Sequence, residues 1–600
     1  MQLTRFLIPF TAALAMPVVA TAAEQLSPTR YIEDVKFLAS DAMQGRGNGS
    51  PELEQAAEYI SAQFRASGLQ PAGEDKGYFQ AFEITTGATL GAKNELKIGD
   101  TVLKIDADFV PIVFSDTAQF DGPLVFAGYG ITAPEYKYDD YAGIDATNKI
   151  VVAFTHEPQE LDTKSVFAGT DYTVHASFVN KAINARMHGA KGIVFITDPS
   201  HDYEEVGTAT RREQAGDISI PSVHAKRAVI VEAFKKGGKD LAEIRKAIDK
   251  DLAPQSFEVP GLTAHIATDV TRIRKKVRNV IGALPGTDPQ LKDEWIVIGA
   301  HYDHLGLGGA SSMAPSLIGQ PHHGADDNAS GTAGVMELAR VAAKSPNARK
   351  RSILFMAFAG EEVGLLGSSH FTNDPTIPLA SIDAMINMDM IGRVSNNRIT
   401  VGGVGTSPSF KPALDEFAPR SGLTVQPTES GYGASDQTAF NAKKIPVLFF
   451  FSGTHTDYHK PSDTADKINT AGAVKVLALV QQLTERFAGE PEKLVYAEVQ
   501  EPRNSGRGSG GGYGPFFGSV PDFRDDIKGV LFADVVNNSP AAKAGLKGGD
   551  IMVAFDGKTV QSLNDYAFIL RQKKPGDVVV VGIKRGDKDM TVNVTLEARK

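Results

Sequence analysis

Four near-continuous apolar runs constrain the fold of this chain most strongly. They lie between about residues 277 and 490 and read WIVIGA, SILFMAFA, AMINMDMI and IPVLFFF. Runs of this length predict strands buried on both faces of a largely parallel sheet. Stretches with helical spacing, such as TAGVMELARVAAK and AGAVKVLALVQQLTERF, stand between or after them. The pattern predicts an α/β fold with a mostly parallel mixed sheet flanked by helices.

Length and composition set the outer limits. A chain of 600 residues is too long for one hydrophobic core, so we expect three or four domains. With 42% hydrophobic and 22% charged residues, the composition is that of a globular protein and not of a disordered one. The net charge of -10 is spread along the chain and leaves no basic face for nucleic acid.

The first residues predict a secretory signal. MQLTR gives a positive start, an apolar segment follows, and ATAA supplies small residues for cleavage before Glu24. A membrane anchor needs about 20 apolar residues, and this run is shorter and is broken by Pro9 and Pro17. We therefore expect residues 1–23 to be a signal peptide, the mature chain to have no membrane span, and the protein to be periplasmic or secreted.

Residues of the types that commonly bind metals, His, Asp and Glu, follow every one of the four apolar runs. In open α/β sheets ligands bind at the carboxyl ends of the strands, so these positions belong to one edge. The chain has no cysteine, so any metal must be held by His, Asp and Glu. The agreement of the strand ends predicts a metal site. The candidates are His301, Asp303, Glu361, Glu362, Asp389, His455 and His459, with Asp326 and Asp327 in a loop directly before a helix.

The donor types indicate the metal and its chemistry. Imidazole with carboxylate, without thiolate, suits zinc and also manganese, cobalt or iron. Two histidines with three carboxylates exceed the three protein ligands that one catalytic zinc normally takes. A pair of metals about 3.5–4 Å apart, sharing a carboxylate and a water, is the simplest interpretation and predicts hydrolysis of an amide or ester bond. Of the adjacent glutamates, one would bind metal and the other would act as general base.

These motifs resemble those of the M28 family of zinc metallopeptidases, the aminopeptidase Y and bacterial leucyl aminopeptidase type. The matching pieces, in the family's order over roughly 275–490, are GAHYDHLG, GADDNASG, AGEEVGLLGS, INMDMIGR and DYHKPSDT. The resemblance implies a zinc exopeptidase (phosphorylase/hydrolase-like) fold and two Zn²⁺ per chain. It also implies an aminopeptidase whose substrates are peptides with a free N-terminus.

The resemblance also implies roles for individual residues. One zinc would be held by His301 and Asp389, the other by Glu362 and His459, and Asp327, in preference to Asp326, would bridge them. Glu361 would be the general base, Asp303 would orient the histidine ligand, and Tyr458 would steady the oxyanion. We do not expect His304, His322 and His323 to be ligands, and we expect His455 to be structural. Asp436 matches a family position near the site but receives no role.

The flanking segments resemble two other modules. Residues 120–258 resemble a protease-associated (PA) domain inserted between an N-terminal part, 24–119, and the main part, 259–490, of the catalytic domain. Residues 513–600 resemble a bacterial PDZ domain, and 491–512 would be a flexible linker. A PDZ domain implies a peptide or protein ligand added to a sheet edge. The carboxylate-binding loop would lie near Phe516, Phe517 and Gly518.

Several alternatives stay open at this stage. The same fold supports glutaminyl cyclases, which use one zinc, and a carboxypeptidase specificity is possible because the motifs do not contain the residues that read the free terminus. From another class, the chain could be a silent peptide-binding scaffold, or its PDZ domain could merely pack on the enzyme. Residues 305–323 form a Gly- and Ser-rich segment that could be a lid, a pocket wall or a plain loop.

Overall fold

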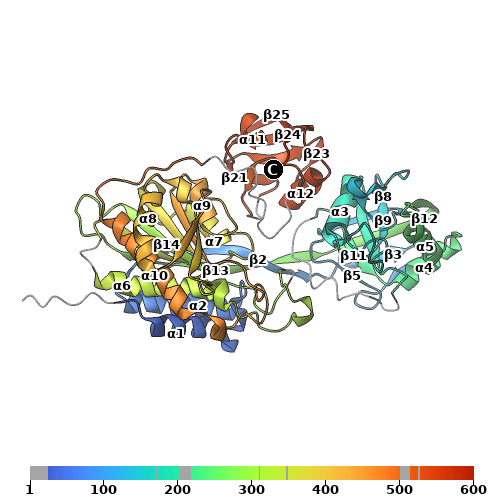
Figure 1. The fold of residues 1–600 in the computed structure, drawn as a ribbon. Coiled ribbons are helices and arrows are strands. Elements are labelled where there is room, and N and C mark those ends of the chain that lie inside the picture. Colours follow the sequence, from blue (N-terminus) through green and yellow to red (C-terminus); the bar gives the residue numbers. More distant parts are fainter. Residues whose placement is uncertain are drawn as a thin grey trace, which may run out of the picture.

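The computed structural model describes residues 25–169, 172–201, 204, 218–309, 311–345, 349–499, 514–524 and 527–599. The predicted signal peptide and most of the predicted linker lie outside these ranges. Figure 1 shows two lobes, joined by two long strands, and a third, smaller body above them near the C-terminus. Among the described residues, no helix is long and apolar enough to cross a bilayer.

The central sheet of the first lobe has the predicted parallel core. Its strand order is β1-β13-β15-β14-β16-β19-β17-β18, with β2 paired to β13. β15, β14, β16 and β19 are mutually parallel, whereas β13 and β17 join them in antiparallel fashion. Each of the four apolar runs forms one of these parallel strands, as predicted. The bounds are β1 Gln70–Pro71, β2 Phe79–Leu90, β13 Val270–Leu284, β14 Trp295–His301, β15 Ser352–Phe358, β16 Ile382–Met388, β17 Arg398–Gly402, β18 Thr424–Pro427 and β19 Val447–Phe451.

Helices cover both faces of this sheet. In β15 the side chains alternate, with Phe355 packed in the larger core and Leu354 and Met356 in the core on the opposite face. This two-sided burial explains why the run is continuously apolar. The larger core includes residues of α1 Pro28–Leu38, α2 Pro51–Ala66, α6 Gly331–Lys344, α8 Phe410–Ser421 and α10 Thr470–Gly489. The other face is covered by α7 Leu366–Asn373 and α9 Gln437–Ala442.

The second lobe is built on its own mixed sheet, in the order β4-β3-β12-β6-β9-β10-β11-β5. β6, β9, β10 and β11 are parallel, and β12 and β5 flank them in antiparallel fashion. β3 and β4 extend the sheet beyond β12, also in antiparallel fashion. Because β3 to β5 and β12 belong to this sheet, the predicted boundaries at 119/120 and 258/259 fall inside it. The strands of this sheet are β3 Glu95–Ile98, β4 Thr101–Leu103, β5 Phe109–Pro111, β6 Ala118–Phe126, β9 Ile150–Phe154, β10 Gly192–Ile196, β11 Ser222–Ala225 and β12 Phe257–Thr268. The helices of the lobe are α3 Phe178–Met187, α4 Arg227–Lys236 and α5 Leu241–Asp251. A small hairpin pairs β7 Thr132–Ala133 with β8 Tyr138–Asp139.

The third body is a small antiparallel β unit with two helices. Its strand order is β20-β21-β22-β24-β25, with β23 paired to β22, so β20 lies at one edge. Its elements are β20 Ser519–Pro521, β21 Val530–Val535, α11 Pro540–Lys543, β22 Ile551–Phe555, β23 Lys558–Thr559, α12 Leu563–Arg571, β24 Val578–Arg585 and β25 Lys588–Thr595.

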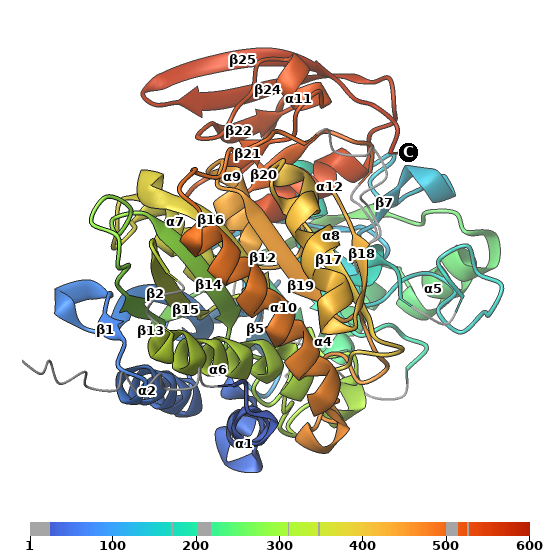
Figure 2. The ribbon, with the colours of Figure 1, turned by 60° about the vertical axis from the view of Figure 1, so that its left-hand side comes forward.

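The third body contacts both lobes, and in Figure 2 it lies along the top of the molecule. Toward the second lobe, Arg186 Nη2 lies 2.5 Å from Asp565 Oδ1. Toward the first lobe, Lys444 Nζ lies 2.7 Å from Asp534 Oδ2. Phe523 covers Gly364, where an added Cβ would lie 2.6 Å from the phenylalanine Cβ. Gly364 follows the paired glutamates, so this body reaches the loop that carries them.

Candidate metal centre

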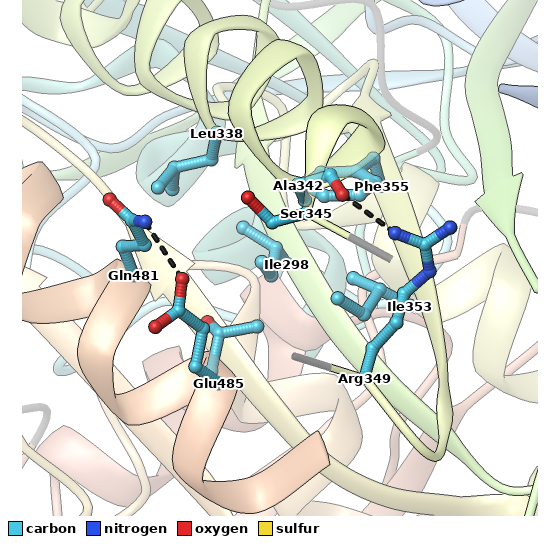
Figure 3. Close-up of a pocket in the computed structure, with 10 residues that line it drawn as sticks. Ile298, Leu338, Ala342, Ser345, Arg349, Ile353, Phe355, Gln481 and Glu485 are labelled. Atoms are coloured by element: carbon cyan, nitrogen blue, oxygen red, sulfur yellow. Dashed lines mark hydrogen bonds between the residues drawn. The ribbon is translucent and has the colours of Figure 1, made fainter. Parts of the chain in front are cut away.

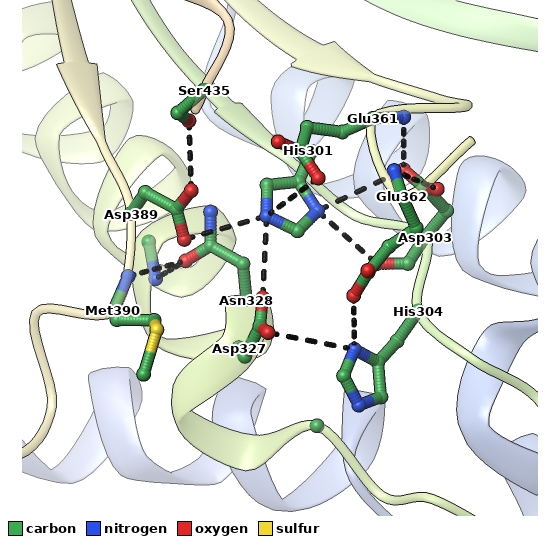
Figure 4. A network of polar contacts seen from close by, with 12 residues as sticks. His301, Asp303, His304, Asp327, Asn328, Glu361, Glu362, Asp389, Met390 and Ser435 are labelled. Atoms are coloured by element: carbon green, nitrogen blue, oxygen red, sulfur yellow. Dashed lines mark hydrogen bonds and ion pairs between the residues drawn. The ribbon is translucent and has the colours of Figure 1, made fainter. Parts of the chain in front are cut away.

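The carboxyl edge of the first sheet gathers the predicted ligands, as Figure 4 shows for His301, Asp327, Glu361, Glu362 and Asp389. His301 ends β14, Asp389 directly follows β16, and Glu361 and Glu362 lie in the loop after β15. His459 lies further along the loop after β19, and Asp327 comes from the turn that precedes α6. The parallel strands end at one edge, so residues far apart in sequence meet there. The structure brings together His301, Asp327, Glu361, Glu362, Asp389 and His459.

Asp327 lies between two groups of donors. Its Oδ1 is 3.4 Å from His301 Nε2, and the same nitrogen is 3.4 Å from Asp389 Oδ1. Its Oδ2 is 3.3 Å from His459 Nε2, which is 3.2 Å from Glu362 Oε2. The two oxygens of one carboxylate therefore face two separate donor pairs.

These separations suit two zinc ions. Zinc bonds to nitrogen and oxygen of about 2.0–2.1 Å in a tetrahedral arrangement set neighbouring ligand atoms about 3.3–3.4 Å apart. The four distances around Asp327 lie between 3.2 and 3.4 Å, longer than normal charged hydrogen bonds. Three carboxylates gathered at one buried edge also repel each other unless cations offset their charge. The residues present therefore fit a paired metal site.

His304 belongs to this cluster, although the sequence did not lead us to expect it. Its Nδ1 is 2.6 Å from Glu362 Oε1 and 3.9 Å from Asp327 Oδ2, and the side chain is buried. The distance to Glu362 is that of a short charge-assisted hydrogen bond. His304 therefore fixes the oxygen of Glu362 that does not face His459. Its position four residues after the end of the run WIVIGA was the available signal.

The adjacent glutamates have different surroundings. Both oxygens of Glu362 face imidazoles, whereas Glu361 Oε2 lies 3.8 Å from His301 Nε2, beyond hydrogen-bonding distance. Burial raises the pKa of Glu361 well above its ordinary value; His301 opposes this rise, and Asp389 and Glu362 add to it. Burial also acts to raise the pKa of Glu362, but its histidine partners outweigh that effect and lower it to about 2. The two neighbouring carboxyl groups thus have pKa values displaced in opposite directions.

Asp303 holds the backbone that carries the two glutamates. Its Oδ1 accepts the N–H of Glu361 at 3.2 Å, and its Oδ2 accepts the N–H of Glu362 at 3.3 Å. Its carboxylate is 3.7 Å from His301 Nδ1, and its backbone oxygen is 3.2 Å from that nitrogen. Asn48 Nδ2 donates to Asp303 Oδ2 at 2.7 Å from the N-terminal segment. The orienting role predicted for Asp303 stays a prediction, and its hydrogen bonds add a second task.

Other buried groups hold the loops around the cluster, and sequence reasoning gave them no role. The guanidinium of Arg46 donates to the carbonyl oxygens of Tyr302 at 2.9 Å and Gly324 at 3.0 Å. Asp463 Oδ2 accepts the N–H groups of Asp326 at 2.8 Å and Asp327 at 3.2 Å. Asp463 lies in DYHKPSDT, so the motif contained the signal, whereas Arg46 lies far away in sequence. Both residues fix the backbone that aims Asp327.

Asp326 and His455 form a pair beside the cluster. Asp326 Oδ1 accepts the N–H of Gly392 at 2.6 Å, and its Oδ2 is 3.3 Å from His455 Nε2. Asp326 is therefore engaged elsewhere, and its neighbour Asp327 faces the donors. At another buried carboxyl, Asp436, burial raises the pKa to about 7, and the charge of His301 opposes this rise.

The segment 305–323, described except for residue 310, contacts the cluster. His459 Nδ1 lies 2.9 Å from Ser311 O, and the backbone oxygen of His459 accepts the N–H of Met313 at 3.0 Å. This segment therefore orients His459. Tyr458 stacks on the His459 ring with centroids 3.8 Å apart. Burial and nearby carboxylates, Asp327 first, raise the pKa of Tyr458, so its hydroxyl stays protonated.

The residues predicted for peptide binding lie at the N-terminal start of the third body. Phe516 exchanges backbone hydrogen bonds with Glu597, and Gly518 has a positive φ of 92°. Phe517 is buried and packs against Phe532, Phe555 and Tyr566. The side chain of Phe517 is thus part of the core, and the peptide-binding role of this loop stays a prediction.

A pocket elsewhere in the first lobe is separate from the metal cluster. It lies among α6, β14, β15 and α10. Figure 3 shows two hydrogen bonds at its wall, from Gln481 to Glu485 and from Arg349 to the backbone oxygen of Ala342. Its described lining contains one carboxylate and no histidine, so it offers no metal site.

Comparison with known proteins gives three family matches in the predicted order. The model of peptidase family M28 matches residues 279–484, that of the PA domain residues 120–232, and that of the PDZ domain residues 515–596. The predicted resemblance and the predicted fold class are confirmed.

Curated relatives include two fungal enzymes. The chain is 31% identical over 307 residues to leucine aminopeptidase 1 of Leptosphaeria maculans, covering 45% of this chain and 75% of that protein. It is also 31% identical over 207 residues to leucine aminopeptidase 1 of Coccidioides posadasii, covering 32% of this chain and 50% of that protein. The chain spans about half the length of several curated relatives it matches.

A solved aminopeptidase from Aneurinibacillus sp. strain AM-1 is 22% identical and covers 80% of this chain and 98% of that one. Its TM-score of 0.46 is too low to add to the family match.

Proposed function

The chain belongs to peptidase family M28, and we propose that it is a zinc-dependent aminopeptidase that removes N-terminal residues from peptides. One observation carries this proposal. The two oxygens of Asp327 face two donor groups, each with an imidazole and a second carboxylate, at 3.2–3.4 Å. A bridging carboxylate between two such groups is the arrangement that a co-catalytic metal pair requires.

In this proposal each residue has one task. His301 and Asp389 hold one zinc, Glu362 and His459 hold the other, and Asp327 bridges the two. Bound zinc acts as a Lewis acid that polarises a carbonyl and lowers the pKa of water. His304 keeps Glu362 in place through its 2.6 Å contact.

Glu361 would move the proton. It stands beside the cluster without a close hydrogen-bonding partner, 3.8 Å from His301 Nε2, so its carboxylate has room to accept a proton from the attacking water. Glu361 would then pass this proton to the leaving amine, as a general base that turns general acid does. The backbone N–H groups of Glu361 and Glu362 both donate to Asp303. These hydrogen bonds fix the backbone of the two residues, so each carboxylate keeps its own position.

The test uses the full chain. Zinc content is measured first, and hydrolysis of a panel of aminoacyl anilides and unblocked peptides second. We expect at least two zinc ions per chain, two of them at this centre, and release of N-terminal residues, with blocked N-termini resistant. One zinc with cyclisation of N-terminal glutamine, release from the C-terminus only, or a zinc-loaded chain without turnover would each contradict the proposal.

We further propose that residues 1–23 are removed on export to the periplasm or medium, and that the PDZ domain binds a peptide or protein ligand. The charge pattern and small residues before Glu24 support the first proposal. The edge position of β20 supports the second. N-terminal sequencing of the secreted protein tests the first, since a chain that begins at Met1 would contradict it.

A further inference from the structure

A second cluster of metal-ligand side chains lies in the PA domain, far from the peptidase motifs in sequence. His156 and Glu160 stand in the loop after β9, and His201 stands in the loop after β10. β9 and β10 are adjacent and parallel, so both loops leave the same carboxyl edge of the second sheet. That edge is where open α/β sheets bind ligands.

The three side chains converge on one point. His156 Nδ1 is 2.8 Å from Glu160 Oε2, and His201 Nε2 is 2.6 Å from Glu160 Oε1. The two ring nitrogens are also only 3.1 Å from each other. Each ring nitrogen can donate to its own oxygen of Glu160, so hydrogen bonds can hold the cluster together without an ion. The close approach of the two ring nitrogens nevertheless gathers three metal-ligand atoms around one point, which is the arrangement that a bound cation needs.

A cation at the centre would take a lone pair from each of the three side chains, and its charge would offset that of Glu160. We propose that His156, Glu160 and His201 bind a divalent metal ion of the zinc class, separate from the peptidase centre. Two imidazoles and one carboxylate form a ligand set that zinc takes in proteins, with a fourth position left for water. The observed separations are slightly below those of tetrahedral zinc, so the side chains would move apart by a fraction of an ångström.

The surroundings are built to hold these ligands. Tyr172 donates its hydroxyl to Glu160 Oε2 at 3.0 Å and stacks on the His156 ring. Ser200 Oγ donates to Glu160 Oε1 at 3.3 Å. Glu160 itself is buried, with a side chain 2% exposed. Such supporting hydrogen bonds are typical of metal ligands, since they fix orientation and charge.

The backbone of both loops is also anchored. Lys181 is buried and donates its ammonium group to the backbone oxygens of Phe154, at 2.9 Å, and His156. Arg227 Nη1 donates to the backbone oxygen of His201 at 2.9 Å. These contacts hold the two loops at the sheet edge before any ion arrives. A metal bound there would join the two loops, and its role would be to stabilise the PA domain, which in a chain without cysteine has no disulfide to do so.

The proposal is tested by counting zinc equivalents. Full-length protein is stripped with a chelator and titrated with Zn²⁺ by calorimetry, and His201→Ala is compared with the wild type. We expect the variant to bind one equivalent fewer and to lose a zinc-dependent rise of several degrees in the unfolding midpoint. The matched control is His175→Ala, whose ring also pairs with a glutamate of the same domain, Glu135 at 2.7 Å, but in a pair and not a triangle. It should bind as many equivalents as the wild type.

An equal number of equivalents in His201→Ala and wild type would overturn the proposal. Should His201→Ala not fold, anomalous diffraction at the zinc edge from wild-type crystals grown with zinc decides the matter. A peak among the three side chains supports the site. Peaks confined to the peptidase centre overturn it.

Discussion

The two mixed sheets differ in how many carboxylates stand beside the histidines at the carboxyl edge of their parallel strands. At the peptidase edge, Asp327, Glu362 and Asp389 face imidazoles at 3.2–3.4 Å, and Glu361 stands beside them at 3.8 Å. At the PA edge, among the described residues of the cluster, Glu160 is the one carboxylate, and each of its oxygens faces a histidine.

The difference indicates what each site is for. A catalytic site needs a carboxylate beyond those that hold the metals, because ligation occupies the lone pairs that would take a proton. The peptidase edge has that carboxylate, whereas in the part of the chain that the structure describes the PA cluster contains Glu160 alone. We therefore expect chemistry only at the peptidase edge and stabilisation at the PA edge.

The largest expected effect comes from removing the extra carboxylate. Glu361→Gln should lower kcat at least about 10²-fold, the size of a general-base contribution, while zinc content stays at the wild-type value. Steady-state kinetics on an aminoacyl anilide, with zinc measured on the same sample, checks this. Near-normal kcat would show that Glu361 is not the base.

The corresponding substitution at the neighbouring residue, Glu362→Gln, should weaken zinc binding. Glu362→Gln replaces the acceptor that faces both His304 and His459, so we expect about one zinc per chain to be lost at moderate chelator concentration. Elemental analysis after dialysis against a chelator measures it, with Glu361→Gln as the matched control. If Glu361→Gln loses zinc and Glu362→Gln keeps it, the two roles are reversed.

A substitution at Asn48 tests whether the hydrogen bond from Asn48 to Asp303 stabilises the peptidase metal centre. Asn48→Ala removes the donor to Asp303 Oδ2 and leaves the hydrogen bonds from Glu361 and Glu362 in place. We expect zinc affinity to fall about tenfold, toward the lower end of the effect of such supporting residues. Competition with a chromogenic chelator measures the affinity. An Asn48→Asp variant, which sets a second carboxylate against Asp303, should be worse than Asn48→Ala, and the reverse order would contradict this account.

The smallest effect is expected at the PA edge. Tyr172→Phe deletes the hydroxyl that donates to Glu160 Oε2 and keeps the ring stacked on His156. Zinc affinity of this site should fall by less than about tenfold, with kcat unchanged. The same chelator competition resolves the change. A fall in kcat, with zinc at the peptidase centre retained, would show that the two edges are coupled.

The sequence alone determined most of the fold and the chemical class of the peptidase site. The apolar runs at 295–300 and 352–359 form β14 and β15, because strands buried on both faces must be continuously apolar. The strand ends then place their ligand residues at one edge, which is why the metal site was predictable without distances. The order of the three modules followed from motifs that the family matches confirm.

Tertiary structure decided which side chains meet. His304 contacts Glu362 across 58 residues, and Asn48 contacts Asp303 across 255 residues, so no local pattern encodes either pair. The PA cluster shows the same limit, since two loops bring His156 and His201 together across 45 residues. His156 also adopts a positive φ of 57°, a backbone state that periodicity does not reveal. Sequence fixes the residue types at a sheet edge, whereas loop backbone conformation aims their side chains.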